Sequence, residues 1–406
     1  MIDVSFLEKL LDGVEVDWKA LGSVCTIETG KLNANAAVND GAFMFFTTAK
    51  EPSRINEYRW DTEALLIAGN ANVGEVKHYS GKFEAYQRTY VLTNFANGVS
   101  IRFLYYVLSN DLKKHLEERT NSAAMTYIVL STLEDFQFPI PCPDDPKKSL
   151  EIQSEIVRIL DTFTELTTEL TTELNLRKEQ YEYYRDQLLS FEEGEVEWKA
   201  LGEVAEIYGG LTGKSKADFD GGNAKYITYK NIFSNLAVDL ESLESVKISD
   251  SENQHCVEYG DVLFTGSSET ADEAGMSSVV TSDFAHPIYL NSFSFGLRFK
   301  AGICIAPDFS KHLFRCSFMR TKISKSASGV TRFNISKERF RKIPIPIPCP
   351  DNPKKSLEIQ SEIVRILDTF TELTAELTAE LKARKKQYEY YRDLLLSFPK
   401  PDKESE

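Results

Sequence analysis

The sequence predicts an α+β chain in which two globular mixed α/β domains are separated by two long helices that form an antiparallel coiled coil. Three observations lead to this fold class. Two stretches of the chain recur almost unchanged, the longer one has the periodicity of an unbroken helix, and the segments between the repeats contain runs typical of strands. The 406 residues suffice for at least two domains with cores of their own, arranged as a pseudo-twofold repeat.

The repeats define the plan of the chain. "VDWKALGSVCTI" at Val16–Ile27 returns as "VEWKALGEVAEI" at Val196–Ile207, an offset of 180 residues. The 52 residues of Ile140–Phe191 return as Ile347–Phe398, an offset of 207, with seven differences. The segments between the repeats show little similarity to each other. We therefore expect two recognition modules of different specificity on a symmetric frame.

We expect six segments. They are residues 1–21, the N-terminal part of the frame; 22–139, the first recognition domain; 140–195, the first long helix; 196–346, the second recognition domain; 347–398, the second long helix; and 399–406, a disordered tail.

Both variable segments contain strand and helix signals. The first has strand-like runs at Phe43–Thr48, Ala64–Gly69 and Thr89–Asn94 and a helical stretch at Ile101–Arg119. The second has strand-like runs at Ala224–Tyr229, Asp261–Gly266 and Phe293–Phe299 and a helical stretch at Ala306–Ala327.

Each constant segment is predicted to be one long helix. It begins at Asp145-Pro146 or Asn352-Pro353, where Asp or Asn suits the N-cap and Pro suits the first helical position. Pro146–Ser190 contains no internal Gly or Pro, so the helix can run for roughly 65 Å at ~1.5 Å per residue. One exposed amphipathic helix of this length cannot cover its own apolar stripe, but two copies can cover each other. Because a globular segment separates the copies, we expect them to pack antiparallel.

The helices carry a repeated four-residue unit, "FTELTTELTTEL" from Phe163 and "FTELTAELTAEL" from Phe370. A tetrad adds ~6 Å and turns the helix by a net of about 40°, so it lengthens the helix and keeps the apolar face nearly in register. We expect this unit to act as a spacer whose coiled-coil contacts come from Phe163, Leu166, Leu170, Leu174, Phe370, Leu373, Leu377 and Leu381.

The formal net charge of −15 does not exclude a nucleic-acid partner, because the acidity is concentrated in one part of the chain. Pro146–Glu195 has 12 acidic against 6 basic residues. Gly22–Phe138 has 13 against 11, and Gly202–Ile345 has 17 against 17. Within the latter, Lys322–Lys342 gathers seven basic residues against a single Glu338. The segments between the helices can therefore hold local basic faces.

No enzymatic motif is recognisable. "GGLTGKS" at Gly209–Ser215 has three residues between Gly209 and the Gly-Lys-Ser, where a phosphate-binding loop needs four. Its three glycines, together with Lys214 and the following Lys216, still predict a flexible basic loop suited to a DNA backbone. "GSSET" at Gly266–Thr270 is either a turn after a strand or a source of base contacts, and both interpretations stay open. No motif of a DNA methyltransferase, nuclease or helicase is found, so the chain is predicted to be non-catalytic.

The six cysteines include no CxxC pair and the five histidines show no metal-ligand spacing, so we expect buried thiols and no metal site. No run of 18 apolar residues and no signal peptide is found, so we expect no membrane span and a cytoplasmic location.

The order of several motifs resembles the specificity subunit of a type I restriction-modification system over nearly the whole chain. The motifs are "WKALGEVAEI", "YITYKNI", "GDVLFTGSSETADEAG", "YLNSFSFGLRF", "SGVTRFNISKERFRKIPIPIP" and the long-helix repeat that ends in "YYRDLLLSF". The first variable segment departs from the pattern, because "NSAAMTYIVLSTLEDFQFPIPCP" has no Arg where Arg332 stands in the second.

The resemblance implies a protein that reads DNA without modifying it. Each variable segment would be a target recognition domain for one half of a split, asymmetric double-stranded sequence. The paired helices would dock two methyltransferase subunits, which carry S-adenosylmethionine, and motor-nuclease subunits would add ATP- and Mg²⁺-dependent translocation and cleavage. No cofactor is expected on this chain itself.

We expect the DNA contacts among basic, amide, hydroxyl, acidic and aromatic side chains of the variable segments, including the basic and aromatic runs Gly81–Leu92 and Ser328–Lys342. The candidates in the first domain are Lys31, Asn70, Asn72, Lys82, Tyr86 and Arg88, and those in the second are Lys214, Lys216, Tyr229, Lys230, Ser268, Glu269 and Arg332.

Two alternatives remain at this stage. One is a scaffold whose coiled coil joins protein partners and whose two globular domains bind peptides, which the net acidity favours slightly. The other is a fused enzyme with a hidden active site, which the missing motifs disfavour.

Overall fold

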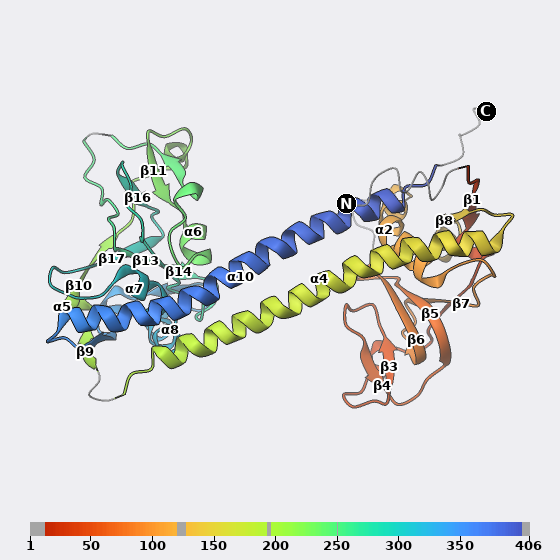
Figure 1. Ribbon diagram of the computed structural model, residues 1–406, viewed down its shortest axis with the longest axis horizontal. Coiled ribbons are helices and arrows are strands. Elements are labelled where there is room, and N and C mark those ends of the chain that lie inside the picture. Colours follow the sequence, from red (N-terminus) through yellow and green to blue (C-terminus); the bar gives the residue numbers. More distant parts are fainter. Residues whose placement is uncertain (1–12, 120–126, 193–195, 250, 400–406) are drawn as a thin grey trace. The chain divides into compact units, whose positions relative to one another are not determined.

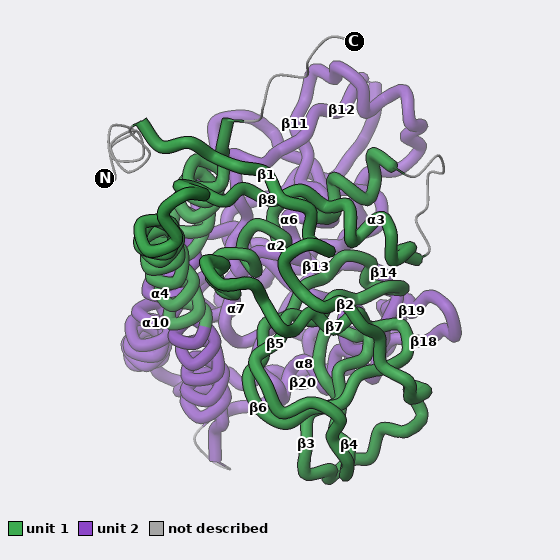
Figure 2. The backbone as a smooth tube through the Cα atoms, turned by 90° about the vertical axis from the view of Figure 1, so that its right-hand side faces the viewer, with its two compact units in different colours: residues 1–171, 380–406 green, residues 172–379 purple. Residues whose placement is uncertain are grey.

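The computed structural model of the chain describes residues 13–119, 127–192, 196–249 and 251–399, in two compact units (Figure 1). Unit 1 comprises residues 1–171 and 380–406, and unit 2 comprises residues 172–379 (Figure 2). The first twelve residues of the predicted frame and residues 400–406 of the predicted disordered tail lie outside the described residues.

Unit 1 is built on a six-stranded sheet with the order β2-β7-β5-β6-β3-β4. Its neighbours are antiparallel except for the β3–β6 pair. The predicted strands around residues 43, 64 and 89 and the predicted helix from Ile101 are confirmed. The elements are β2 (Thr26–Thr29), β3 (Phe43–Phe46), β4 (Ser53–Ile55), β5 (Trp60–Ala68), β6 (Val76–Ala85), β7 (Thr89–Thr93), α2 (Ile101–Glu118), α3 (Leu130–Glu134) and the 3-10 turns η1 (Leu21–Ser23) and η2 (Ala34–Ala36).

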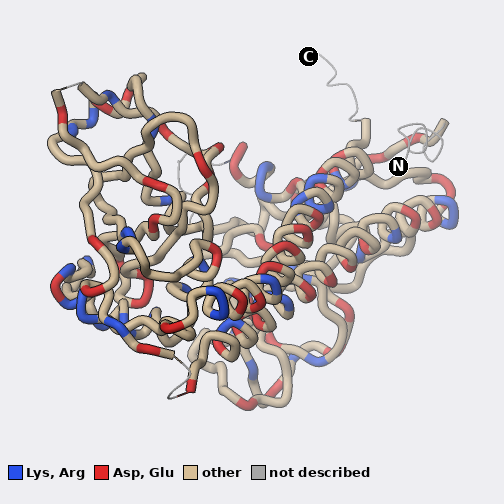
Figure 3. The backbone as a smooth tube through the Cα atoms, turned by 60° about the vertical axis from the view of Figure 1, so that its left-hand side comes forward, with Lys and Arg blue, Asp and Glu red and all other residues tan. Residues whose placement is uncertain are grey.

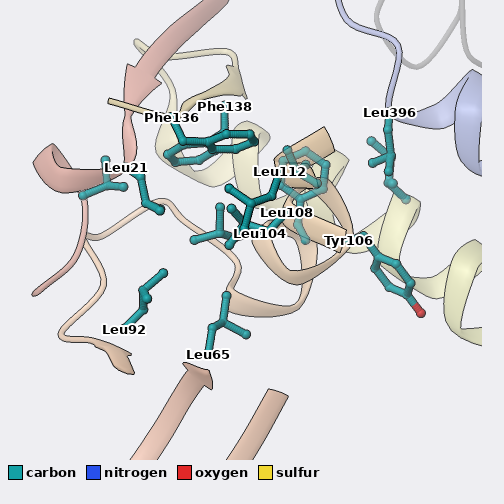
Figure 4. Close-up of a cluster of buried hydrophobic side chains, with 14 of the residues drawn as sticks. Leu21, Leu65, Leu92, Leu104, Tyr106, Leu108, Leu112, Phe136, Phe138 and Leu396 are labelled. Atoms are coloured by element: carbon teal, nitrogen blue, oxygen red, sulfur yellow. The ribbon is translucent and has the colours of Figure 1, made fainter. Parts of the chain in front are cut away.

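Helix α2 forms the centre of the unit 1 core. Leu104, Leu108 and Leu112 recur every fourth residue, so they lie on one face of the helix. All three are fully buried, between Leu65 and Leu92 of the sheet and the aromatic pair Phe136 and Phe138 (Figure 4). At roughly 25 cal/mol per Å² of apolar surface, each buried leucine contributes about 1.5–3 kcal/mol.

Unit 2 holds smaller sheets, with the orders β10-β17-β13-β15, β12-β11-β16 and β14-β19-β18. Its strands are β10 (Ala205–Gly209), β11 (Ala224–Ile227), β12 (Glu244–Val246), β13 (Val262–Thr265), β14 (Ser267–Ser268), β15 (Ser277–Val279), β16 (Ile288–Leu290), β17 (Ser294–Phe299), β18 (Ala327–Ser328) and β19 (Phe333–Ile335). Its short helices are α5 (Leu201–Val204), α6 (Tyr229–Ser234), α7 (Pro307–Leu313), α8 (Ser317–Lys325), α9 (Lys337–Phe340), η3 (Lys216–Phe219) and η4 (Leu240–Ser242).

The single helical stretch predicted at Ala306–Ala327 is wrong, because it forms two helices, α7 and α8. The chain breaks between them at Phe314–Cys316. Phe314 and Cys316 are two residues apart and both are buried, with 0% and 1% of their surface exposed. The break lies at Cys316, whose backbone is extended (φ −69°, ψ 152°), and the Ser317 N–H that begins α8 donates to the Asp186 carboxylate at 3.0 Å.

The two units share a frame of equivalent parts. In unit 1, β1 (Val16–Ala20) pairs antiparallel with β8 (Gln137–Pro141), and in unit 2, β9 (Val196–Ala200) pairs with β20 (Pro344–Pro348) in the equivalent register. Each ribbon ties the start of a variable segment to its end. The turn that follows is also shared, since Cys142 and Cys349 both take a positive φ, of 50° and 42°.

The two long helices are α4 (Pro146–Leu188) and α10 (Pro353–Leu395), of 43 residues each. The predicted N-caps are confirmed. The Asp145 carboxylate accepts from the backbone N–H groups of Lys147 and Lys148, both at 3.1 Å, and the Asn352 side-chain oxygen accepts from that of Lys355 at 3.2 Å. These bonds satisfy donors that the first turn of a helix leaves unpaired.

The pairing of α4 with α10 is antiparallel, as predicted. In unit 1, Phe163 of α4 stacks on Tyr391 near the end of α10, with ring centres 5.3 Å apart. In unit 2, Tyr184 near the end of α4 stacks on Phe370 of α10, at 5.2 Å. These residues occupy equivalent positions of the repeat. The predicted spacer leucines Leu166, Leu170, Leu373 and Leu377 are half-buried, and Leu174 and Leu381 are buried.

The thiols are less buried than predicted. All six cysteines are free, but only Cys316 is buried and the other five are partly exposed. Burial raises the pKa of Cys25 to about 12 and that of Cys316 to about 11. No helix in the described parts of the chain is both long and apolar enough to cross a membrane.

Candidate nucleic-acid interface

Unit 2 contains a cleft of about 460 Å³ that brings four of the predicted DNA-contacting residues together. Tyr229 comes from α6, Ser268 from β14, Glu269 from the turn after β14, and Arg332 from the turn between β18 and β19. The remaining lining residues are Phe233, Ser267, Glu273 and Thr331. Lys230, also predicted, follows Tyr229 on α6 and is exposed. Segments that are more than sixty residues apart in sequence, such as Ser267 and Arg332, thus line one site.

Strand pairing explains why these segments meet. β14 and β18 both pair antiparallel with β19, which places the β18–β19 turn beside the end of β14. The Arg332 Nε donates to Ser267 Oγ at 3.2 Å, and the Tyr229 hydroxyl donates to the Ser267 carbonyl at 2.8 Å. Gly329 is required in the turn, because a Cβ there would lie 1.9 Å from the Arg332 carbonyl oxygen.

The cleft combines hydrogen-bond donors and acceptors. Arg332 is exposed, and its guanidinium has five N–H donors, of which the bond to Ser267 uses one. Glu269 is exposed and can accept, whereas Glu273 accepts from Ser268 at 3.3 Å and from Thr270 at 2.9 Å. Ser268 itself is only 6% exposed. The GSSET segment thus forms a short strand and a turn, and it also lines the cleft.

The loop Gly209–Ser215, predicted to be flexible and basic, is held in place by its contacts. The Lys214 side chain is 4% exposed, and its Nζ lies 2.5 Å from Glu252 Oε2 and 2.6 Å from the Lys247 carbonyl. The hydrogen bond from Lys214 lowers the pKa of Glu252 to about 2. A Cβ on Gly210 would lie 1.9 Å from the Asn291 carbonyl. We therefore correct the prediction for Lys214, which holds the loop and has no free ammonium for a phosphate. Lys216 is exposed.

Unit 1 has a smaller cleft of about 290 Å³, lined by Thr29, Gly69, Gln87, Arg88, Tyr90, Tyr127 and Ile128. Among the first-domain candidates, Arg88 lines this cleft, and Asn70 adjoins it through a β-bridge to Tyr127. Lys31 precedes Leu32, which bridges to Tyr86.

The other two candidates of the first domain have different contacts. The Asn72 amide donates to the Thr48 carbonyl at 2.7 Å, and Lys82 Nζ lies 4.8 Å from the centre of the Tyr58 ring. The structure does not place Lys82 in the cleft with Arg88. Part of the segment that lacks a counterpart of Arg332, residues 121–126, lies outside the described residues.

Sequence reasoning missed several residues at these sites. The Phe233 ring stacks on the Tyr229 ring, with ring centres 6.0 Å apart, so two aromatic side chains line one side of the unit 2 cleft. Val330, at the tip of the β18–β19 turn, is 91% exposed, more than any other large hydrophobic residue described. Gln87 lines the unit 1 cleft and is exposed, and its position between the candidates Tyr86 and Arg88 was the signal in the sequence. Across the parts that the structure describes, no group of three or more His, Cys, Asp or Glu residues is placed to hold a metal ion.

Charge along the long helices is mixed, and acidic and basic residues both mark the helical tubes in Figure 3. Local pairs include Arg158–Glu155 and Arg365–Glu362, equivalent in the repeat and both at 2.6–2.7 Å. These exposed pairs add little stability. They show that part of the acidity of the helices is neutralised within the frame.

Comparisons with known proteins agree with this architecture. The model of the type I restriction modification DNA specificity domain matches residues 14–179 and again residues 193–384. The type I restriction enzyme EcoR124I/EcoR124II specificity subunit of Escherichia coli is 34% identical over 418 residues, which cover 99% of either chain. A putative type I restriction enzyme specificity subunit of Haemophilus influenzae is 30% identical over 437 residues, covering 97% of this chain and 98% of the relative.

Solved structures share the fold. The S subunit of a type I restriction-modification system from M. genitalium superimposes with a TM-score of 0.59 at 14% identity, over 96% of this chain and 98% of that one. A chain from a structural study of complex assembly and conformational transition of the type I restriction-modification system gives 0.58 at 14% identity, over 94% and 97%.

Proposed function

The chain belongs to the family of type I restriction-modification DNA specificity subunits, and on that premise we propose that its two recognition domains read the two halves of a split double-stranded DNA sequence. As a specificity subunit the chain recognises the DNA target of its complex and is not itself catalytic. The scaffold and fused-enzyme alternatives are thereby set aside.

The observation that carries the proposal is the mounting of two unlike domains on a duplicated frame. The domains differ in sequence and in sheet order, so two different half-sites, and hence an asymmetric target, are expected. The frame repeats the same ribbon, the same turn and the same aromatic stack in each unit. Equivalent surfaces suit two identical partner subunits.

In unit 2 the cleft suggests how bases are read. Arginine donates two hydrogen bonds to guanine O6 and N7 in the major groove, and glutamate accepts from cytosine N4. Arg332 and Glu269 line the same cleft and have these two abilities. The aromatic rings of Tyr229 and Phe233 form an apolar surface beside them. In unit 1, the cleft that contains Arg88 is the corresponding candidate.

The partners supply the chemistry. We expect two methyltransferase subunits with S-adenosylmethionine on the frame, and restriction subunits with ATP and Mg²⁺ joined through them. This chain is expected to bind none of these cofactors, and the complex is expected to act on DNA in the cytoplasm.

The test is co-expression of the chain with the methyltransferase subunit encoded beside it, followed by sequencing of the methylated bases of the host DNA. We expect one asymmetric motif made of two short half-sites and an unspecified spacer of constant length. A continuous motif, or methylation that does not depend on this chain, would contradict the proposal.

A further inference from the structure

In both units a buried glutamine of the long helix bonds to the recognition domain, beside apolar residues of the same helix that pack into the domain core. Gln153 of α4 and Gln360 of α10 are equivalent residues of the repeat, and each is 0% exposed. A polar side chain is rarely buried to this degree unless hydrogen bonds compensate for its lost hydration.

The two glutamines make the same three bonds. In unit 1, Gln153 Oε1 accepts from the Ser100 backbone N–H at 2.8 Å, and its Nε2 donates to the Gly98 carbonyl at 2.8 Å. Its second amide hydrogen goes to Ser149 Oγ, at 2.9 Å, one helical turn earlier.

Unit 2 repeats this pattern. Gln360 Oε1 accepts from the Ala306 N–H at 2.8 Å, and Nε2 donates to the Cys304 carbonyl at 2.7 Å and to Ser356 Oγ at 3.0 Å. Ser149 and Ser356 are 1% and 0% exposed, so each amide is fixed in orientation by a buried hydroxyl of its own helix.

The groups that bond to the two glutamine side chains belong to the main chain of the variable domains. In each unit they are an N–H and a carbonyl two residues apart, immediately before a helix, at the N-caps of α2 and α7. The side chains at these positions are unlike, Gly98 and Ser100 against Cys304 and Ala306. Because every residue except proline has both backbone groups, this contact does not depend on the sequence of the recognition domain.

Side-chain contacts then follow on the same helices. In unit 1, Arg102 of α2 lies 2.7 Å from Asp161 of α4. In unit 2, His312 of α7 lies 2.8 Å from the equivalent carboxylate, Asp368 of α10. Each long helix thus presents an equivalent glutamine and an equivalent aspartate to its recognition domain. The glutamine contact is identical in both units, while the contact to the aspartate varies with the domain.

We propose that Gln153 and Gln360 are positioning residues that set the orientation of each recognition domain on its long helix, and thereby make the complex discriminate between spacer lengths. The inference rests on the proposed split target. One base pair more or less moves a half-site by ~3.4 Å and by about 35° around the duplex. A domain locked to its helix cannot follow this shift, whereas a loosened domain can.

The test uses Gln153→Met and Gln360→Met in the full chain, assembled with its methyltransferase partner. Methionine keeps the length and volume of the side chain and removes all three bonds. Binding is measured on duplexes with the natural spacer and with one base pair added or removed. We expect the unaltered complex to prefer its own spacer by at least about 10- to 100-fold, because a displaced half-site loses one base contact or more, and each variant to prefer it by less than about 3-fold. The penalty for altering a half-site base should stay unchanged.

Gln187→Met is the matched control, since Gln187 lies on the same helix α4 and is exposed. Amide hydrogen exchange should show lost protection at Ser100 or Ala306 in the matching variant only. If a methionine variant does not fold, Ser149→Ala and Ser356→Ala, which remove only the hydroxyl that orients each amide, are expected to relax spacer preference partly. Unchanged spacer discrimination in a variant that has lost this protection would overturn the inference. An unaltered complex without a split motif would overturn the proposed function, and the inference with it.

Discussion

Removing one tetrad from each long helix is expected to shorten the recognised spacer and to leave both half-sites unchanged. The deletions are Thr171–Leu174 in α4 and the equivalent Thr378–Leu381 in α10. Four residues of helix correspond to ~6 Å of rise and a net turn of about 40°. Since DNA advances ~3.4 Å per base pair, the spacer should lose one or two base pairs.

Both helices must be shortened together. The aromatic residues that stack in the two units, at positions 163 and 184 of α4 and 370 and 391 of α10, are 21 residues apart in each helix. A deletion in α4 alone leaves 17 residues opposite 21, so one stack is lost or one helix is distorted. An aromatic pair contributes about 0.5–1.5 kcal/mol beyond the area it buries, so the single deletion should lower the melting temperature and reduce methylation.

The assay is sequencing of the methylated bases after each deletion variant has been co-expressed with the methyltransferase subunit. The double deletion should yield the same two half-sites at a shorter distance. An unchanged spacer in an active double-deletion variant would refute the spacer role of the tetrads. A changed half-site would show that the deletion had disturbed a recognition domain.

Three further predictions concern unit 2. Arg332→Ala should weaken specific DNA binding by about 1–3 kcal/mol in a titration of the assembled complex. Lys385→Ala, on the exposed face of α10, should leave the affinity unchanged. Equal affinity of the two variants would remove Arg332 from the interface. Lys216→Met should reduce the slope of log affinity against log salt by about 0.9, the value expected for the loss of one phosphate contact. Lys214→Met should leave this slope unchanged and lower the thermal stability, because the Lys214 ammonium is held inside the loop. Burial lowers the pKa of His312 from its ordinary 6.5, although the neighbouring Asp368 carboxylate acts in the opposite direction. As the pH falls, the unfolded chain therefore binds a proton at this residue before the folded chain does. The stability of unit 2 should thus fall as the pH drops below 6.5. Urea unfolding at pH 7.5 and 5.5 measures this loss, and His312→Gln should remove it.

Periodicity and capping in the sequence determined the long helices. The apolar spacing, the Asp-Pro and Asn-Pro starts and the absence of internal Gly and Pro act locally, within a turn or two of helix. The same local signals located β3, β5, β7 and α2. They failed at α7 and α8, because the carboxylate that accepts from the first N–H of α8 belongs to Asp186, 131 residues away along the chain.

The candidate site could be predicted only in part, because its residues meet through long-range pairing. Composition pointed to Arg332, Glu269 and Tyr229 one by one, and the strands around β19 brought them into one cleft. The same composition favoured Lys214, whose ammonium the fold holds within its own loop.

The repeat in the sequence determined by itself that this protein is a symmetric frame with two different domains, since near-identity over 52 residues needs no coordinates to be recognised. Tertiary structure alone decided how the frame holds those domains. Gln153 and Gln360 look like solvent-facing residues of a charged helix, and nothing in their neighbourhood along the chain marks them as buried. Their partners lie 53 and 54 residues away, so the hydrogen bonds that justify their burial exist only once each recognition domain has folded against its helix.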